Sequence, residues 1–174
     1  MSSKKDFEKF LNDHVKEEEE NKINWELQKQ EWLEYIDAFY HQIEEWFEPY
    51  VANKLVQYVY IDTELVESHI GSYKTRKMKI DFAGQSLVME PIGTLLIGSK
   101  GRIDMEGARG RVQFVLADKS HKSLRILARG SKEQQSAKQI EWVWKIATRD
   151  AKSITFLEFK ETHFFDALME IINV

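Results

Sequence analysis

The chain has no cysteine among its 174 residues. This absence excludes disulfide bonds, thiolate metal sites and cysteine nucleophiles, and it fits a reducing cytoplasm. No apolar run approaches the roughly 18 residues of a membrane-spanning helix, and the opening stretch, MSSKKDFEKF, lacks the apolar segment of a signal peptide. We therefore expect a cytoplasmic protein with no membrane partner.

Proline and recognisable catalytic motifs are also scarce. Only Pro49 and Pro91 occur, and the glycines separate short apolar segments in the second half of the chain. No phosphate-binding loop, dinucleotide fingerprint, nucleophile elbow or Ser-His-Asp pattern is present. These absences favour a non-enzymatic protein with no cofactor.

Asn24–Glu48 has the pattern of one long amphipathic helix. At about 100° per residue its large apolar side chains fall within one continuous arc, which includes Trp25, Trp32, Leu33, Ile36, Phe39, Tyr40, Ile43, Trp46 and Phe47. The opposite face is acidic and carries Glu31, Glu34, Asp37, His41, Glu44, Glu45 and Glu48. Asn24 suits an N-cap, and Pro49 suits the end of the helix because proline cannot continue the hydrogen-bond ladder.

A shorter helix is predicted before it, over Asp6–Glu20, where Phe7, Phe10, Leu11, His14 and Val15 recur at helical spacing. Its four terminal glutamates oppose the helix dipole, so we expect the helix to end there. A turn through Asn21–Ile23 then makes the two helices an antiparallel pair or an extended arm. The width of the aromatic arc also suggests a homodimer through these N-terminal helices.

After Pro49 the sequence alternates in the manner of antiparallel strands. Met78, Ile80 and Phe82 point one way, while Lys77, Lys79 and Asp81 point the other. The expected strands are Leu55–Ile61, Tyr73–Ala83, Ser86–Glu90, Thr94–Ile97, Arg102–Met105, Arg111–Ala117, Ser123–Leu127, Ile140–Ala147 and Ser153–Phe159. Ser153–Phe159 is apolar nearly throughout, which predicts a central strand, and Thr162 suits the cap of a final helix, His163–Ile172.

This order predicts a single α+β domain: a helical pair or arm over residues 1–50, an antiparallel meander of about seven or eight strands over residues 51–161, and a C-terminal helix over residues 162–174. The sheet should be curved and should pack its apolar side on the long helix and the C-terminal helix. Gly130–Lys138 has linker composition but is too short to divide domains.

The net charge of −4 conceals a division of charge along the chain. Residues 1–50 hold fourteen acidic and six basic side chains, whereas residues 99–132 hold three acidic and nine basic ones. Two turns of the form Gly-x-basic-Gly-Arg begin at Gly98 and Gly107. Glycine-rich backbone and arginine suit an anion such as phosphate, so these turns predict a nucleic-acid or phosphate-binding surface made of Lys100, Arg102, Arg109, Arg111 and Arg125.

The stretch Arg102–Lys119 resembles, distantly, the catalytic hairpin of restriction-endonuclease-like nucleases. In that family an Asp on one strand and an acid-x-Lys motif on the next hold a divalent ion that activates water. Here Asp104 and Asp118 correspond to the two acids. The chain departs from the family pattern because Ala117 stands two residues before Lys119 and Asp118 is adjacent to that lysine.

Asp37, His41 and Glu45 lie one turn apart on the long helix, a spacing at which they could share a zinc or manganese ion. The other helix supplies no matching set beyond His14 and its glutamates, so we expect no metal site.

The leading hypothesis is therefore a non-enzymatic accessory, inhibitor or immunity-type protein. Its acidic helix face, comprising Glu34, Asp37, His41, Glu45 and Glu48, would bind a partner protein with a basic surface. The first alternative is a nucleic-acid or phosphate-binding module that uses the basic turns. The second is a metal-dependent nuclease-like domain on Asp104 and Asp118.

Overall fold

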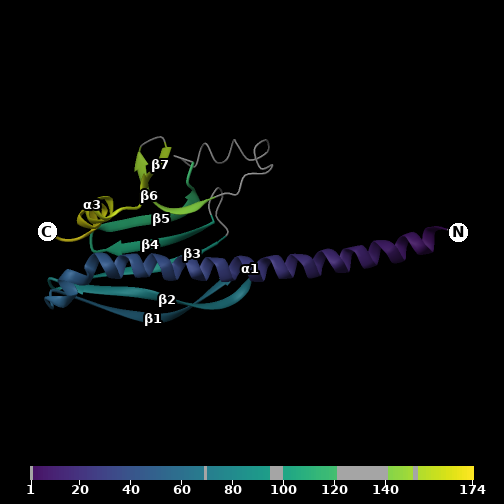
Figure 1. Cartoon of the computed structure of the whole chain (residues 1–174), viewed down its shortest axis with the longest axis horizontal. Coiled ribbons are helices and arrows are strands. Elements are labelled where there is room, and N and C mark those ends of the chain that lie inside the picture. The colour runs from purple at the N-terminus through teal and green to yellow at the C-terminus, as the bar shows by residue number, and fades with distance from the viewer. Residues whose placement is uncertain (1, 69, 95–99, 121–140, 151–152) are drawn as a thin grey trace.

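The computed structural model describes residues 2–68, 70–94, 100–120, 141–150 and 153–174 (Figure 1). A long N-terminal helix lies across an open, seven-stranded antiparallel sheet, and a short C-terminal helix follows the last strand. The predicted α+β layout is confirmed. Within the described residues, no helix has a segment long and apolar enough to cross a membrane.

Helix α1 runs without interruption over Ser2–Ala52. The two helices expected over Asp6–Glu20 and Asn24–Glu48 are therefore joined, and Asn24 is an interior residue, not a cap. The predicted turn through Asn21–Ile23 is helical because this stretch contains neither glycine nor proline to interrupt the backbone hydrogen bonds. Of the two arrangements considered, the structure adopts the extended arm.

The helix also continues past Pro49, which was expected to end it. The end is instead set by Lys54, whose backbone adopts a left-handed φ of 60°. The Leu55 amide donates to the Tyr50 carbonyl at 2.9 Å, and the Lys54 amide donates to the Val51 carbonyl at 3.0 Å. These two bonds form a Schellman motif, which satisfies the last carbonyls of the helix.

The strands follow one another as neighbours in the sheet, so the predicted meander is confirmed. They are β1 (Val56–Glu67), β2 (Gly71–Phe82), β3 (Gln85–Gly93), β4 (Gly101–Gly107), β5 (Gly110–Asp118), β6 (Trp142–Asp150) and β7 (Ser153–Glu158). The strand expected at Ser123–Leu127, the segment Gly130–Lys138 and most of Thr94–Ile97 lie outside the described residues.

Two strand predictions need correction. Pro91 was expected to separate strands but lies inside β3, beside an irregularity in the register between Pro91 and Gly93. This position is compatible with proline, which cannot donate to a regular ladder. The strand Ser153–Phe159 was expected to be central, yet β7 pairs only with β6 and lies at the edge of the described sheet. An apolar run alone does not distinguish the two positions, because Phe156 packs on Val115 and Ala117 on the sheet face away from the helices.

Both helices cover the same face of the sheet and enclose the main core. From α1, the fully buried side chains are Trp32, Ile36, Phe39, Tyr40 and Ile43; from the strands they include Met78, Ile80, Leu87, Met89, Ile103 and Phe114. Helix α3 (Glu161–Ile171) contributes Phe164, Leu168 and Ile171. The predicted packing of the apolar sheet face on both helices is thus confirmed.

Helix α3 begins earlier than predicted. Its N-cap is Lys160, with no side-chain capping bond, and the Phe164 amide donates to the Lys160 carbonyl at 2.9 Å. Thr162 therefore lies within the first turn. The burial of Phe164 against Phe47 and Phe114 positions this helix more strongly than a cap would.

Trp32 fixes where α1 crosses the sheet. Its indole is fully buried, its Nε1 donates to the Tyr73 hydroxyl at 3.1 Å, and its ring lies directly over Gly101 of β4. A Cβ at Gly101 would lie 2.2 Å from the ring, whereas a Cβ at Gly110 would meet only the Ile171 methyl group at 3.5 Å. The close approach of helix and sheet therefore depends on the missing side chain of Gly101.

We expect Gly101→Ala to lower the free energy of unfolding by about 2 kcal/mol, because overpacking a rigid core costs roughly 1 to 3 kcal/mol. Gly110→Ala is the matched control, since it makes the same substitution in a strand with room for a methyl group. Urea denaturation followed by tryptophan fluorescence measures both. Equal loss in the two variants would show that Trp32 does not close on Gly101.

Candidate functional site

The structure aligns the five residues of the predicted partner-binding surface. Glu34, Asp37, His41, Glu45 and Glu48 are all solvent-exposed and recur every three or four residues along α1, on the side away from the sheet. We call this set the acidic stripe. Its orientation follows from the core, because the intervening Ile36, Phe39, Tyr40 and Ile43 are held against the strands.

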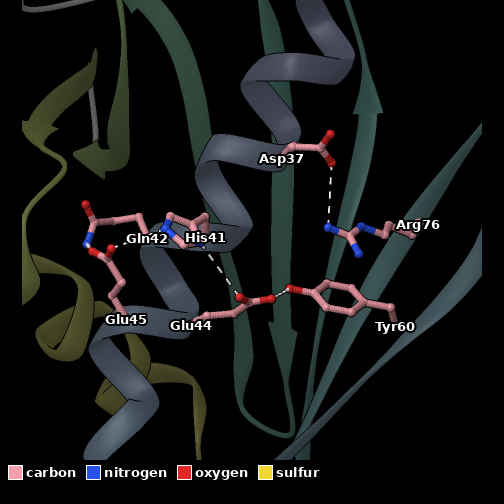
Figure 2. A network of polar contacts seen from close by, with 7 residues as sticks. All are labelled: Asp37, His41, Gln42, Glu44, Glu45, Tyr60 and Arg76. Atoms are coloured by element: carbon pink, nitrogen blue, oxygen red, sulfur yellow. Dashed lines mark hydrogen bonds and ion pairs between the residues drawn. The ribbon is translucent and has the colours of Figure 1, made fainter.

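One member of the acidic stripe reaches the sheet. The Asp37 carboxylate lies 3.6 Å from the guanidinium group of Arg76 in β2 (Figure 2). Arg76 in turn lies 3.8 Å from the centroid of the Tyr60 ring, a cation–π distance. Asp37 is therefore partly neutralised within the molecule. In the described part of the chain, neither Glu34 nor Glu48 has an ion-pair partner.

His41 lies between two carboxylates of the same helix (Figure 2). Its Nε2 is 3.3 Å from Glu45 and its Nδ1 is 4.0 Å from Glu44. Glu44 also accepts a hydrogen bond from the Tyr60 hydroxyl. Burial and this bond to Glu44 raise the pKa of Tyr60, which keeps the phenol protonated as a donor. Glu44 is thereby held toward the sheet while Glu45 stays on the outer surface.

The spacing Asp37, His41 and Glu45 does not produce a metal centre within the residues that the structure describes. No group of three histidine or carboxylate side chains is placed there to hold one ion. Instead, Asp37 pairs with Arg76 and Glu45 pairs with His41. Glu45 also accepts a hydrogen bond from the Gln42 side-chain amide at 3.3 Å. The side chains are engaged in separate pairs.

Lys100, the first residue of the predicted anion-binding surface, contacts α1. Its ammonium group forms an ion pair with Glu31 and lies 5.4 Å from the Tyr35 ring centroid and 5.6 Å from the Trp142 ring centroid. Only 14% of the side chain is exposed. A basic turn residue and the acidic helix thus neutralise each other at this point.

Arg102 and Arg111 converge on a third residue, Asp104. The Arg102 Nε lies 2.9 Å from the Asp104 carboxylate, and Arg111 lies 3.6 Å from it and 3.7 Å from Glu106. Asp104 is buried, and burial raises its pKa against the opposing effect of the two arginines. Arg109 is exposed at the β4–β5 turn, and Arg125 lies outside the described residues.

The structure does not bring the two acids of the nuclease-like hairpin together. Asp104 pairs in register with Gln113, and Asp118 lies five residues further along β5, roughly 17 Å away at about 3.4 Å per residue. Asp118 accepts hydrogen bonds from the Ser120 amide at 2.9 Å and from the Ser120 hydroxyl at 2.8 Å. Asp104 neutralises arginines and Asp118 shapes a turn.

A cleft of about 960 Å³ adjoins the acidic stripe. Its described lining is Glu31, Glu34, Tyr35, Ala38, Lys100, Glu141 and Trp142. Sequence reasoning did not connect α1 with Lys100 and Trp142, because their contact spans more than sixty residues and depends on how the helix crosses the sheet. The repeated aromatic spacing that includes Trp32 was the nearest available signal, since it fixed which side of α1 faces the strands.

We expect Asp104→Ala to destabilise the fold by about 2 kcal/mol, because it leaves the partly buried Arg102 without its counterion. Glu106→Ala should cost less than about 0.5 kcal/mol, since Glu106 and its partner Arg111 are both more than half exposed. Chemical denaturation of the two variants provides the comparison. A stable Asp104→Ala variant would contradict the structural role of Asp104.

Comparison of the chain with protein-family models, curated proteins and solved structures gave no significant match.

Proposed function

We propose that this protein is a non-enzymatic interaction module whose acidic stripe binds a partner protein with a basic surface. The observation that carries the proposal is the alignment of Glu34, Asp37, His41, Glu45 and Glu48 on one exposed face of a helix whose opposite face is buried. In such a binder the charges are held in a fixed spacing before the partner arrives.

This rigidity supports binding in two ways. The backbone of α1 between Trp32 and Phe47 is anchored by the aromatic core, so little conformational entropy would be lost when a partner docks. Several carboxylates in a row also produce a negative field that speeds the encounter with a basic surface. His41 adds a polar group at the centre of the stripe.

The anion-binding alternative has weaker support. Lys100, Arg102 and Arg111 already form ion pairs with Glu31, Asp104 and Glu106. A phosphate would have to displace these carboxylates to reach the basic groups. The nuclease-like alternative is weaker for a similar reason, since Asp104 is held by arginines.

Self-association and cellular location are separate from this binding surface. The homodimer was suggested by the width of the aromatic arc, but Trp32, Phe39 and Ile43 are fully buried under the sheet and do not offer a dimer surface. Self-association therefore needs a different basis. A cytoplasmic location still depends on the absence of cysteine.

Charge reversal tests the acidic stripe. The triple variant Glu34→Lys, Glu45→Lys and Glu48→Lys should recover at least about tenfold less of its basic partner in affinity capture with mass spectrometry, because attraction becomes repulsion. Binding by the unchanged protein should weaken steeply as salt is raised.

The matched control reverses three exposed carboxylates elsewhere, Glu158→Lys, Asp166→Lys and Glu170→Lys, and so makes the same change in net charge. It should retain the partner. Equal loss in both variants would mean that only overall charge matters, and the proposal would fail. Retention of the unchanged protein on heparin, abolished by Arg109→Glu, would favour the anion-binding alternative instead.

A further inference from the structure

The first part of α1 forms an arm that extends beyond the sheet (Figure 1). Every residue from Ser3 to Glu20 is exposed, over a length of about 27 Å at about 1.5 Å per residue. Among the helix residues whose burial the structure describes, the first fully buried one is Trp32. An unsupported helix of this length is marginally stable in water, so a surface that packs on it would stabilise it.

The arm carries an apolar face that the sheet does not cover. Phe7, Phe10, Leu11 and Val15 are 58%, 64%, 45% and 52% exposed, and they lie on one side of the helix together with His14. His14 stacks on Phe10 and forms an ion pair with Glu18, so these two contacts stay within the arm. We call Phe7, Phe10, Leu11, His14 and Val15 the arm face.

The charges at the two ends of the arm face have opposite signs. Lys4, Lys5 and Lys9, with Asp6 and Glu8 among them, lie at its start, and Lys16 and Glu17–Glu20 follow its end. All of these side chains are exposed. The start therefore has a small excess of positive charge and the end a larger excess of negative charge. At about 100° per residue, Lys4 and Glu18 are the two that lie on the same side of the helix as the arm face.

This arrangement is complementary to a second copy of itself in the antiparallel orientation. The midpoint between Lys4 and Glu18 is Leu11, and Leu11 is also close to the middle of the arm face. A twofold axis at Leu11 would place apolar residues on apolar residues and Lys4 of each copy beside Glu18 of the other. A parallel pair would place Lys4 on Lys4 and Glu18 on Glu18.

We propose that two copies of this protein associate through their arm faces as an antiparallel helical pair centred on Leu11. The proposal is independent of the acidic stripe, which lies more than four helical turns further along α1. It differs from a dimer through the aromatic arc, because the side chains of that arc are buried in the core. The pair would hold the two sheets at opposite ends of a shared rod and would present two acidic stripes to one partner or to two.

The exposed area predicts a weak association. A phenylalanine side chain can bury about 150 to 250 Å², so two half-exposed phenylalanines with their aliphatic neighbours offer roughly 400 Å² per copy. The total of roughly 800 Å² is below the range of stable standard interfaces. We therefore expect a dissociation constant in the micromolar range or weaker.

Sedimentation of the full chain over a wide concentration range is the first test. The mass should rise from the 20.6 kDa monomer toward twice that value as the concentration increases. Leu11→Glu should raise the dissociation constant at least about tenfold, because it places two like charges at the axis. Val66→Glu makes the same change at a side chain that is 79% exposed on β1 and should leave association unchanged.

The orientation can be tested with introduced thiols, because the chain has no cysteine of its own. Mixed Lys4→Cys and Glu18→Cys proteins should form a disulfide between the two variants under mild oxidation. Lys4→Cys alone should not, since the two thiols of an antiparallel pair would lie roughly 20 Å apart, far beyond disulfide reach. A rapid homodisulfide of Lys4→Cys would overturn the antiparallel arrangement.

Charge reversal and rescue separate pairing from general surface effects. Lys4→Glu should weaken association, and adding Glu18→Lys should restore it, because the opposite charges at positions 4 and 18 are re-formed across the interface. A mass of 20.6 kDa at every concentration would overturn the proposal. So would a monomer that binds anionic lipid vesicles through Phe7 and Phe10, since the arm face would then be a membrane contact.

Discussion

The fold depends on one packing interaction, the contact between the aromatic side of α1 and the sheet. The ring centroid of Phe39 lies within 5.2 Å of the ring centroids of Phe114, Trp144 and Phe159. Residues of β5, of β6 and of the segment after β7 therefore converge on one turn of α1. Because this contact fixes the rotation of α1 about its axis, it also determines which residues face solvent. The acidic stripe is therefore a consequence of core packing as much as of its own sequence.

The uneven charge along the chain has two different outcomes in the folded protein. Where α1 passes Lys100 and Arg76, helix carboxylates neutralise basic groups of the sheet, and Asp104 does the same for Arg102 and Arg111. On the outer face of α1, the carboxylates of Glu34 and Glu48 are exposed to water. Internal neutralisation thus leaves the basic turns with less free charge for an anion than the outer face of the helix has for a basic partner.

Features that depend on local periodicity could be predicted from the sequence. The two faces of Asn24–Glu48 and the alternation around Met78 and Ile80 were correct, since both follow from the geometry of a single element. Features that depend on tertiary context could not. The two predicted helices are continuous because no helix-breaking residue separates them, although Asn24 suggested a new N-cap. The edge position of β7 depended on what covers Phe156. The pairing of Glu31 with Lys100 depended on where α1 crosses the sheet.

The meander order of the strands has a consequence for how the protein is made. Each strand pairs with the next one in the sequence, so hairpins can form one after another as the chain emerges. Helix α1 is synthesised before all of them, while its core partners Trp144 and Phe164 belong to β6 and α3, which follow the first five strands. Until then the aromatic side of α1 is only partly covered by the earlier strands, and the charges on its acidic side oppose aggregation of the helix.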